Sequence, residues 1–72
     1  MEGGKFVQIM LNGKSVEFDS EVNLLDFLEM RGIEPNRVVV EYNGDIAKRE
    51  DWRSITLKDN DRLEILKFVG GG

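Results

Sequence analysis

The residues most suited to taking part in a reaction stand at the C-terminal end of the sequence, where Phe68 and Val69 are followed by Gly70, Gly71 and Gly72. Glycines carry no side chains, so these three form a thin thread that spans about 10 Å at ~3.3 Å per residue. Such a thread can enter a channel too narrow for other sequences. We therefore expect Gly70 and Gly71 to thread into a partner and the α-carboxylate of Gly72 to react. A frayed chain end is the simplest alternative.

The composition excludes most catalytic roles. The 72 residues include no histidine and no cysteine, so the chain has no imidazole base, no thiolate nucleophile and no soft metal ligand. We expect no catalytic residue, no metal site and no cofactor held by this chain. An enzyme acting alone is the weakest functional class.

Net charge and hydropathy limit the kinds of partner and the cellular location that we expect for this chain. Fourteen acidic against ten basic residues give a net charge of −4, which lacks the basic footprint of a nucleic-acid-binding protein and favours a basic protein surface. No stretch approaches the ~20 apolar residues of a membrane span, and no apolar run of signal length follows Met1. We expect a cytoplasmic protein with no membrane or nucleic-acid partner.

A nucleotide-binding motif is suggested by Gly13-Lys14-Ser15 and fails on spacing. A phosphate-binding loop of this type needs an earlier glycine at the position that Gln8 occupies, and a helix directly after the serine. The sequence that follows Ser15 predicts a strand, so Lys14 is a turn lysine.

A calcium loop is suggested by Asp59, Asp61 and Glu64, and it also fails. Such a loop needs alternating oxygen ligands followed by a glycine and a distant glutamate. Leu63 stands where the third ligand should be, so we interpret the two aspartates as turn residues.

The elements that must position the chain end begin with a hairpin. Residues 6–11 and 14–18 predict two strands, and Asn12-Gly13 between them is typical of a type I′ turn because both residues tolerate positive φ. The alternation places one apolar set on the buried face: Val7, Ile9, Leu11, Val16 and Phe18.

One helix follows, over about residues 24–31. Asn23 is a good N-cap, and Gly32 is the expected left-handed residue just beyond the helix. Ile33 can supply the hydrophobic contact of a Schellman ending, and Pro35 prevents continuation. The apolar face of this helix is wide enough to cover one side of a small sheet.

Two strands and a second tight turn come next. The β-branched run at 38–42 predicts a buried strand, Asn43-Gly44 predicts a turn, and residues 45–47 continue as a short strand.

The last third of the chain is less regular. Residues 48–53 are charged around Trp52, which we expect to cap the edge of the core. Residues 54–57 predict a short strand, 59–61 a turn, and 62–69 the final strand.

The predicted fold class is α+β: a roll with a mixed sheet of four to five strands and one main helix packed on one face. The last strand can insert between earlier strands, which leaves its end free to project. A chain of this length makes one domain, 1–72, with flexible ends at 1–5 and 70–72.

Four local patterns occur in a fixed order: the Asn12-Gly13 hairpin, Tyr42–Ile46 followed by Arg49–Trp52, Asp59–Ile65, and Val69–Gly72. Together with the order of elements, they resemble the ubiquitin-like β-grasp fold and, within it, the ThiS family of sulfur carrier proteins of thiamine biosynthesis, over about residues 7–72. One departure is Asn60, where the family usually has glycine. Because asparagine tolerates left-handed geometry, we expect the turn to survive.

The resemblance implies a role as a protein co-substrate, not as an enzyme. The Gly72 carboxylate is expected to be adenylated by a ubiquitin-activating-type adenylyltransferase with ATP. Sulfur from a cysteine-desulfurase source then makes a thiocarboxylate, and thiazole synthase receives that sulfur for the thiazole ring of thiamine.

The last strand also predicts a docking surface. If Leu63 and Ile65 point to the core, Leu66 and Phe68 lie on the opposite face. We expect these two residues, with Val69, to form an apolar patch that docks the partner. The alternative is that a loop covers them.

Three other functions stay open. The chain could be a sulfur carrier of the molybdopterin pathway, which uses the same tail chemistry. It could be a ubiquitin-like modifier whose Gly72 ends in an isopeptide bond. It could also be an interaction module with an inert tail.

Overall fold

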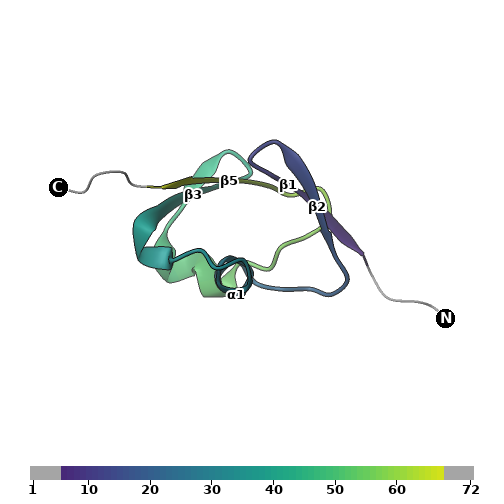
Figure 1. Ribbon diagram of the computed structural model, residues 1–72, viewed down its shortest axis with the longest axis horizontal. Coiled ribbons are helices and arrows are strands. Elements are labelled where there is room, and N and C mark those ends of the chain that lie inside the picture. The colour runs from purple at the N-terminus through teal and green to yellow at the C-terminus, as the bar shows by residue number, and fades with distance from the viewer. Residues whose placement is uncertain (1–5, 68–72) are drawn as a thin grey trace.

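Two layers make up the protein: a five-stranded sheet and, on one of its faces, helix α1 (Leu24–Met30) with two short 3-10 helices. The computed structural model describes residues 6–67. Figure 1 shows the sheet nearly edge-on above α1, which is seen end-on. The predicted α+β class, with one main helix on one face of the sheet, is confirmed.

The final strand lies in the middle of the sheet. The strand order is β2-β1-β5-β3-β4, and β5 runs parallel to β1 and antiparallel to β3. The predicted insertion of the last strand is therefore confirmed; positions 68 and 69 of that prediction lie outside the described residues. The strands are β1 (Val7–Leu11), β2 (Lys14–Phe18), β3 (Val38–Tyr42), β4 (Asp45–Ala47) and β5 (Arg62–Lys67).

Both Asn-Gly pairs form the predicted hairpin turns. Asn12 and Gly13 have φ values of 51° and 82°, and Asn43 and Gly44 have 52° and 95°. Positive φ at both central residues matches the right-handed twist of the flanking strands. The first turn sets the register of β1 against β2, and the second sets that of β3 against β4.

Helix α1 begins at the predicted cap. The Asn23 side chain accepts a hydrogen bond of 2.8 Å from the backbone N–H of Asp26. This bond satisfies one of the N–H groups that have no partner in the first turn. The face of α1 that packs against the sheet buries Leu24, Phe27 and Leu28.

The helix ends in a Schellman motif, as predicted. Gly32 has φ +73°, and its N–H donates to the carbonyl of Glu29 over 3.0 Å. The N–H of Ile33 donates to the carbonyl of Leu28 over 2.9 Å. The chain then enters a 3-10 helix, η1 (Pro35–Arg37), which leads into β3.

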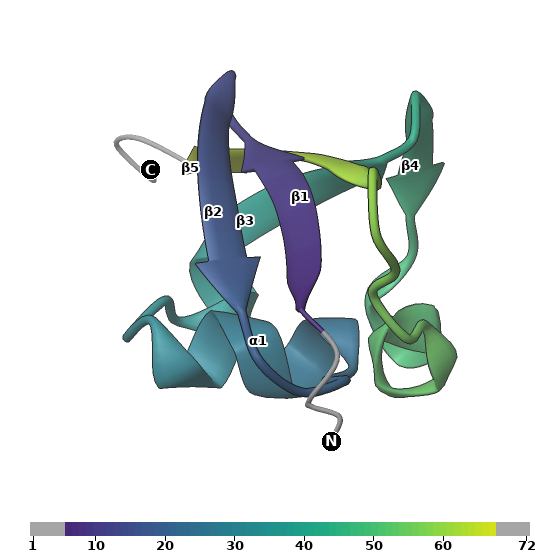
Figure 2. The same cartoon turned by 90° about the vertical axis from the view of Figure 1, so that its right-hand side faces the viewer.

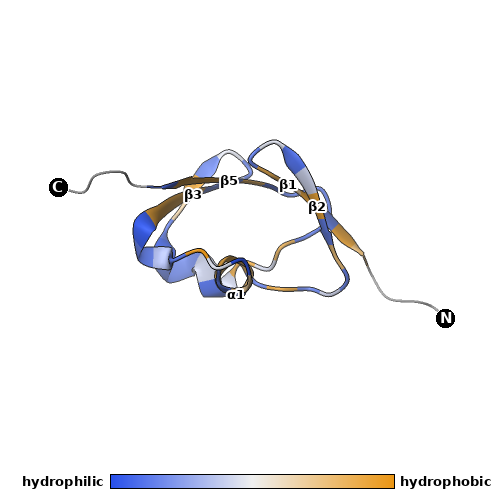
Figure 3. Cartoon of the chain, in the orientation of Figure 1, coloured by the Kyte–Doolittle hydropathy of each residue, from blue (hydrophilic) through white to orange (hydrophobic). Residues whose placement is uncertain are grey.

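The core residues come from both the sheet and the helical layer, and Figure 2 shows these two layers from the side. In Figure 3, β3 is largely hydrophobic, whereas the two 3-10 helices are largely hydrophilic. The core is formed by eleven buried apolar residues: Val7, Ile9, Leu24, Phe27, Leu28, Val38, Val40, Trp52, Leu57, Leu63 and Ile65.

The prediction that Trp52 caps the edge of the core is wrong, because its side chain is only 2% exposed. The charged segment folds as a second 3-10 helix, η2 (Arg49–Ser54), of which Trp52 is the only buried residue. Its indole N–H donates to the carbonyl of Ala47 over 2.8 Å. That bond satisfies the polar edge of the ring, so the rest of the indole can be buried.

The predicted strand at residues 54–57 is also wrong. Ser54 belongs to η2, and only Thr56 forms an isolated bridge, to Asn23. Backbone bonds from Leu57 to Val22 and from Leu24 to Ile55 hold the segment against the start of α1. Because the chain after Asn23 forms helix α1, the bridge between Asn23 and Thr56 cannot extend into a β-ladder.

Within residues 6–67, no helix has the length and apolar character needed to cross a membrane.

Candidate functional site at the end of strand β5

The residues predicted to carry the function gather at and beyond the end of β5. Leu66 lies in the described part of the chain. Phe68, Val69 and the glycines Gly70, Gly71 and Gly72 lie outside it, so their threading, reaction and docking roles stay predictions.

The two faces of β5 differ as the alternation predicts. Leu63 and Ile65 face the core and are 1% and 9% exposed, whereas Leu66 is 56% exposed on the other face. The predicted exposure of Leu66 is confirmed, and no described loop covers its side chain. Its part in docking stays a prediction.

Leu66 is not isolated on that face. Val39 of β3 is its direct cross-strand partner, and Ile46 of β4, 67% exposed, lies on the same side of the sheet. We call Val39, Ile46 and Leu66 the outer apolar patch. Beside it, Glu41 and Glu64 face one another across the same pair of strands. Apolar groups next to two carboxylates fit a partner surface that is apolar with a basic rim.

A hydrogen-bonded clamp ties the first hairpin to β5. Strand β1 pairs with β5 only through Met10 and Leu11. Beyond them, the Asn12 side chain accepts from the N–H of Ile65 over 2.7 Å and donates to the carbonyl of Ile65 over 3.2 Å. The amide of Asn12 thus continues the ladder after the backbone of β1 has turned away.

The second hairpin is tied to the start of β5 in a related way. The N–H of Arg62 donates to the Asn43 side chain over 2.7 Å, and the N–H of Asn43 donates to the carbonyl of Arg62 over 2.8 Å. The two turns therefore hold β5 from opposite sides, and each uses an asparagine amide.

Asp61 forms a buried hydrogen-bonded hub next to that second turn. Its carboxylate is 8% exposed and accepts from the Tyr42 hydroxyl at 2.7 Å, the Asn43 amide at 3.1 Å and the Lys58 N–H at 2.8 Å. A buried carboxylate needs hydrogen-bond donors, and three donors occupy most of the roughly four acceptor sites of Asp61.

The hub changes the acidity of the only tyrosine. Burial, the hydrogen bond to Asp61 and the negative charge of that carboxylate raise the pKa of Tyr42 to about 12. Each of these effects disfavours the phenolate, so Tyr42 stays a hydrogen-bond donor at neutral pH.

The carboxylates of the described residues serve the fold and do not form a metal site. Among residues 6–67, no three His, Cys, Asp or Glu side chains lie close enough together to hold a metal ion. The aspartates weighed as calcium ligands are used otherwise: Asp59 accepts from the N–H of Gln8 over 2.8 Å, and Asp61 forms the hub. The described residues hold β5 firmly and expose an apolar patch beside its end.

Several of these residues were not predicted for the roles they have. The sequence predicts Asn12 and Asn43 only as turn residues with positive φ. That their side chains also bond to β5 can be predicted only when the order of the strands in the sheet is known. Asp61 was interpreted as a turn residue. The signal in the sequence for Val39 is its place in a β-branched run, but only the register places it beside Leu66.

The fold and the sequence both match known proteins. The family model described as the ThiS family matches residues 9–72. The sulfur carrier protein ThiS of Bacillus subtilis is 37% identical over 65 residues, which cover 89% of this chain and 98% of that protein. The crystal structure of the thiamine biosynthesis protein ThiS from Geobacter metallireducens superposes with a TM-score of 0.80 at 33% identity, covering 92% of this chain and all of that one.

A third match is to a larger protein. The thiazole synthase of Paramagnetospirillum magneticum is 29% identical over 66 residues, which are 92% of this chain but only 20% of that protein. The predicted β-grasp fold is confirmed by the ThiS structure, and the match to the family model runs from the first strand to the last glycine. With this coverage in sequence and structure, the chain belongs to the ThiS family, the sulfur carrier proteins of thiamine biosynthesis.

Proposed function

We propose that this chain carries sulfur on the carboxylate of Gly72 and delivers it for the thiazole ring of thiamine. The observation that carries this proposal is that the ThiS family model matches residues 9–72 and therefore includes all three glycines. The chain is a substrate of other proteins and not an enzyme.

Activation must come first, because an ionised carboxylate is a poor electrophile. The pKa of an α-carboxyl group is ~3.3–3.7, so Gly72 is ionised at neutral pH. One of its oxygens attacks the α-phosphorus of ATP and pyrophosphate leaves, which gives an acyl-adenylate. A partner of the ubiquitin-activating type binds the ATP.

Sulfur transfer follows. The outer sulfur of a persulfide, formed by a cysteine desulfurase, attacks the acyl carbon and displaces AMP. A thiol then cleaves the sulfur–sulfur bond and leaves the thiocarboxylate on Gly72. With no cysteine in its 72 residues, the chain cannot hold the persulfide itself, so a partner must present it.

Thiazole synthase is the proposed recipient. Two proteins named thiazole synthase each match this chain over 66 residues, about a fifth of their own length. A ThiS-like segment within a thiazole synthase supports a functional association between the two.

Leu66, Phe68 and Val69 are the proposed docking residues, and we add Val39 and Ile46 because they lie on the same face of the sheet as Leu66. Leu66 is 56% exposed at the base of the tail, so a partner that receives the glycines also meets this patch. The burial of such a patch supplies about 25 cal/mol per Å² of apolar surface.

The test is the intact mass of the protein after incubation with ATP, the activating enzyme of the same organism and a sulfur donor. We expect a gain equal to the mass difference between sulfur and oxygen, which a chain lacking Gly72 does not show. Lysine conjugates of Gly72 would indicate a modifier instead. As a positive control, the activating enzyme must modify a carrier that it is known to activate. If that control works and the mass of this chain stays unchanged, the proposal is contradicted and the chain is better explained as an interaction module.

The same incubation separates the two carrier pathways. The product is offered to thiazole synthase and, in parallel, to a molybdopterin synthase catalytic subunit. We expect loss of the thiocarboxylate sulfur only with thiazole synthase and its small-molecule substrates, and sulfur transfer to the molybdopterin precursor would favour the alternative pathway.

A further inference from the structure

A basic pocket lies beside the end of β5, on the face of the sheet opposite to Leu66. Its volume is about 350 Å³. Three of the ten lysines and arginines of the chain line it, although the chain as a whole has a net charge of −4. The residues around it are Arg31, Ile33, Glu34, Arg37, Val38 and Lys67.

The fold brings these cations together from three segments. Arg31 lines the pocket at the end of α1, directly before the Schellman ending at Gly32. The register pairs Val38 with Lys67, which puts Arg37 next to the last described residue of β5. Alternation along β5 places Lys67 on the same side as Leu63 and Ile65, toward the helical layer.

The cations outnumber the acids that face them. Arg37 pairs with Glu34 at 3.3 Å, and these side chains are 73% and 63% exposed. The Arg31 guanidinium lies 5.6 Å from the centroid of the Phe27 ring, so its contact is with a neutral group. Among the described residues of the pocket lining, three positive charges thus face one carboxylate, that of Glu34.

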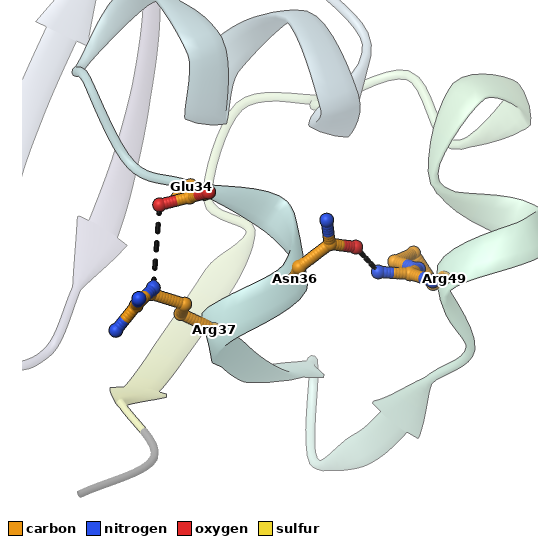
Figure 4. Close-up of polar contacts among 4 residues, drawn as sticks. All are labelled: Glu34, Asn36, Arg37 and Arg49. Carbon is orange, nitrogen blue, oxygen red and sulfur yellow. Dashed lines mark hydrogen bonds and ion pairs between the residues drawn. The ribbon is translucent and has the colours of Figure 1, made fainter. Parts of the chain in front are cut away.

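The ion pair between Arg37 and Glu34 is easily exchanged. Figure 4 shows Arg37 and Glu34 side by side, with β5 (pale yellow) ending close to Arg37. An exposed pair of this kind contributes only ~0–1 kcal/mol. A carboxylate from another molecule can therefore take the place of Glu34 at little cost.

We propose that this pocket binds an aspartate or glutamate side chain of the enzyme that activates Gly72. The inference rests on the proposed function, because it needs an enzyme that encloses the chain end. Such an enzyme must pass over the pocket, since Lys67 both lines the pocket and immediately precedes the tail.

The reacting nucleotide is a poorer occupant. Fully extended, the residues from Lys67 to Gly72 span roughly 16 Å at ~3.3 Å per residue. With the tail extended, the α-phosphate that reacts with Gly72 lies well away from the pocket, whereas the protein wall around the base of the tail lies against it. A partner then contacts both faces of β5, with apolar groups on the Leu66 side and an acid on the Lys67 side.

The experiment uses the full chain with its activating enzyme and measures ATP–pyrophosphate exchange as a function of carrier concentration. The test variant is Arg37→Glu with Lys67→Glu, and a neutral version is Arg37→Gln with Lys67→Gln. The matched control, Arg53→Glu with Lys58→Glu, makes the same change in net charge at two exposed positions outside the pocket. Circular dichroism and thermal unfolding verify that each variant is folded.

We expect the KM for the carrier to rise about tenfold in the Glu variant and by a smaller factor in the Gln variant, with kcat nearly unchanged, because charges at an interface mainly act on association. The KM of the wild-type protein should rise with salt, and that of the Glu variant should depend on salt much less. The control should stay within about twofold of wild type.

Four results would overturn the inference. The KM for the carrier could stay unchanged in the folded Glu variant, or the control could rise as much as the test variant. The KM for ATP could shift instead, which would place a phosphate in the pocket. The KM for the carrier could fall, which would mean that the pocket holds the chain's own carboxylate. If the wild-type chain supports no exchange at all, the proposed function itself fails.

Discussion

Asp61 shows how one side chain fixes the start of strand β5, whose other end leads into the tail. It is nine-tenths buried and accepts hydrogen bonds from Tyr42, Asn43 and the backbone of Lys58. These donors belong to the β3–β4 hairpin and to the loop before β5. Since a buried donor without a partner costs ~1–3 kcal/mol, removal of this carboxylate affects all three donors.

We expect Asp61→Ala to lower the free energy of unfolding by about 2–3 kcal/mol, measured by urea denaturation. Asp59→Ala is the matched control, because its carboxylate is exposed and accepts one hydrogen bond, from Gln8. The control should cost less than about 1 kcal/mol. Equal losses in the two variants would contradict the role of the hub.

The raised pKa of Tyr42, about 12, predicts how stability depends on alkaline pH. The unfolded chain loses the phenol proton near pH 10, but the folded protein keeps it until about pH 12. Over that interval the unfolded state binds fewer protons, so stability falls as pH rises. Below pH 10 this contribution is fully present.

The titration can be observed directly because the chain has only one tyrosine. Tyrosinate absorbance of the folded protein should have its midpoint near pH 12, as the raised pKa of Tyr42 requires. Asp61→Asn should lower that midpoint, since it removes the charge that opposes ionisation. A wild-type midpoint near the ordinary value of ~10 would refute the hydrogen-bonded state of Tyr42.

At the scale of the elements, the two Asn-Gly turns have a second role besides reversing the chain. Asn12 bonds to Ile65 and Asn43 bonds to Arg62, so each turn reaches across to β5. Glycine would satisfy the positive φ of either position, but it has no amide. Asparagine at these two positions is therefore explained both by the positive φ of the turn and by the hydrogen bonds of its side chain to β5.

This explanation predicts that Asn12→Gly destabilises the protein by about 1–2 kcal/mol, although it relaxes the turn. The control is Asn60→Gly, at φ +74°, whose side chain forms no hydrogen bond among the described residues. That control should be neutral within about 0.5 kcal/mol. Chemical denaturation of both variants decides the question; a neutral Asn12→Gly would mean that the clamp contributes nothing.

The elements whose conformation depends on residues close together in the sequence were predicted best. Both hairpins, the Asn23 cap and the Schellman ending depend on residues within a few positions of one another. The left-handed conformation expected at Asn60 is also confirmed, with φ +74°. Trp52 and residues 54–57 were predicted wrongly because their conformation depends on what packs against them: the core in one case and the start of α1 in the other.

The site was predicted in part for the same reason. Alternation along one strand is enough to place Leu66 on the outer face. Val39, the clamps and the basic pocket required the register between β3 and β5, which joins positions far apart in the sequence. The sequence of a single segment cannot predict how its residues pair with those of a distant strand.

At the scale of the whole molecule, the end of β5 separates two different surfaces. On one side lies the outer apolar patch with Glu41 and Glu64, and on the other lies the basic pocket. A partner that receives the tail must match both. Two unlike surfaces around one chain end favour one orientation of approach and disfavour others.

We expect Leu66→Asp to leave the fold intact and to raise the KM for the carrier in ATP–pyrophosphate exchange about tenfold or more. The matched control is Met30→Asp, since Met30 is 70% exposed on α1, away from the patch. Thermal unfolding should be within a few degrees of wild type for both. Phe68→Asp should act like Leu66→Asp, and normal turnover by the well-folded Leu66→Asp, Phe68→Asp double variant would exclude this docking surface.

The central place of β5 also has a mechanical consequence. Whatever follows Lys67 is attached to a strand that is hydrogen-bonded to β3 on one side and to β1 on the other. A force applied along the axis of β5 loads both ladders in shear, so hydrogen bonds on two sides resist together, whereas an edge strand would be held by one ladder alone. If a partner draws the glycines into a channel, as we propose, the load passes to the two ladders of β5 together and the rest of the fold can stay intact.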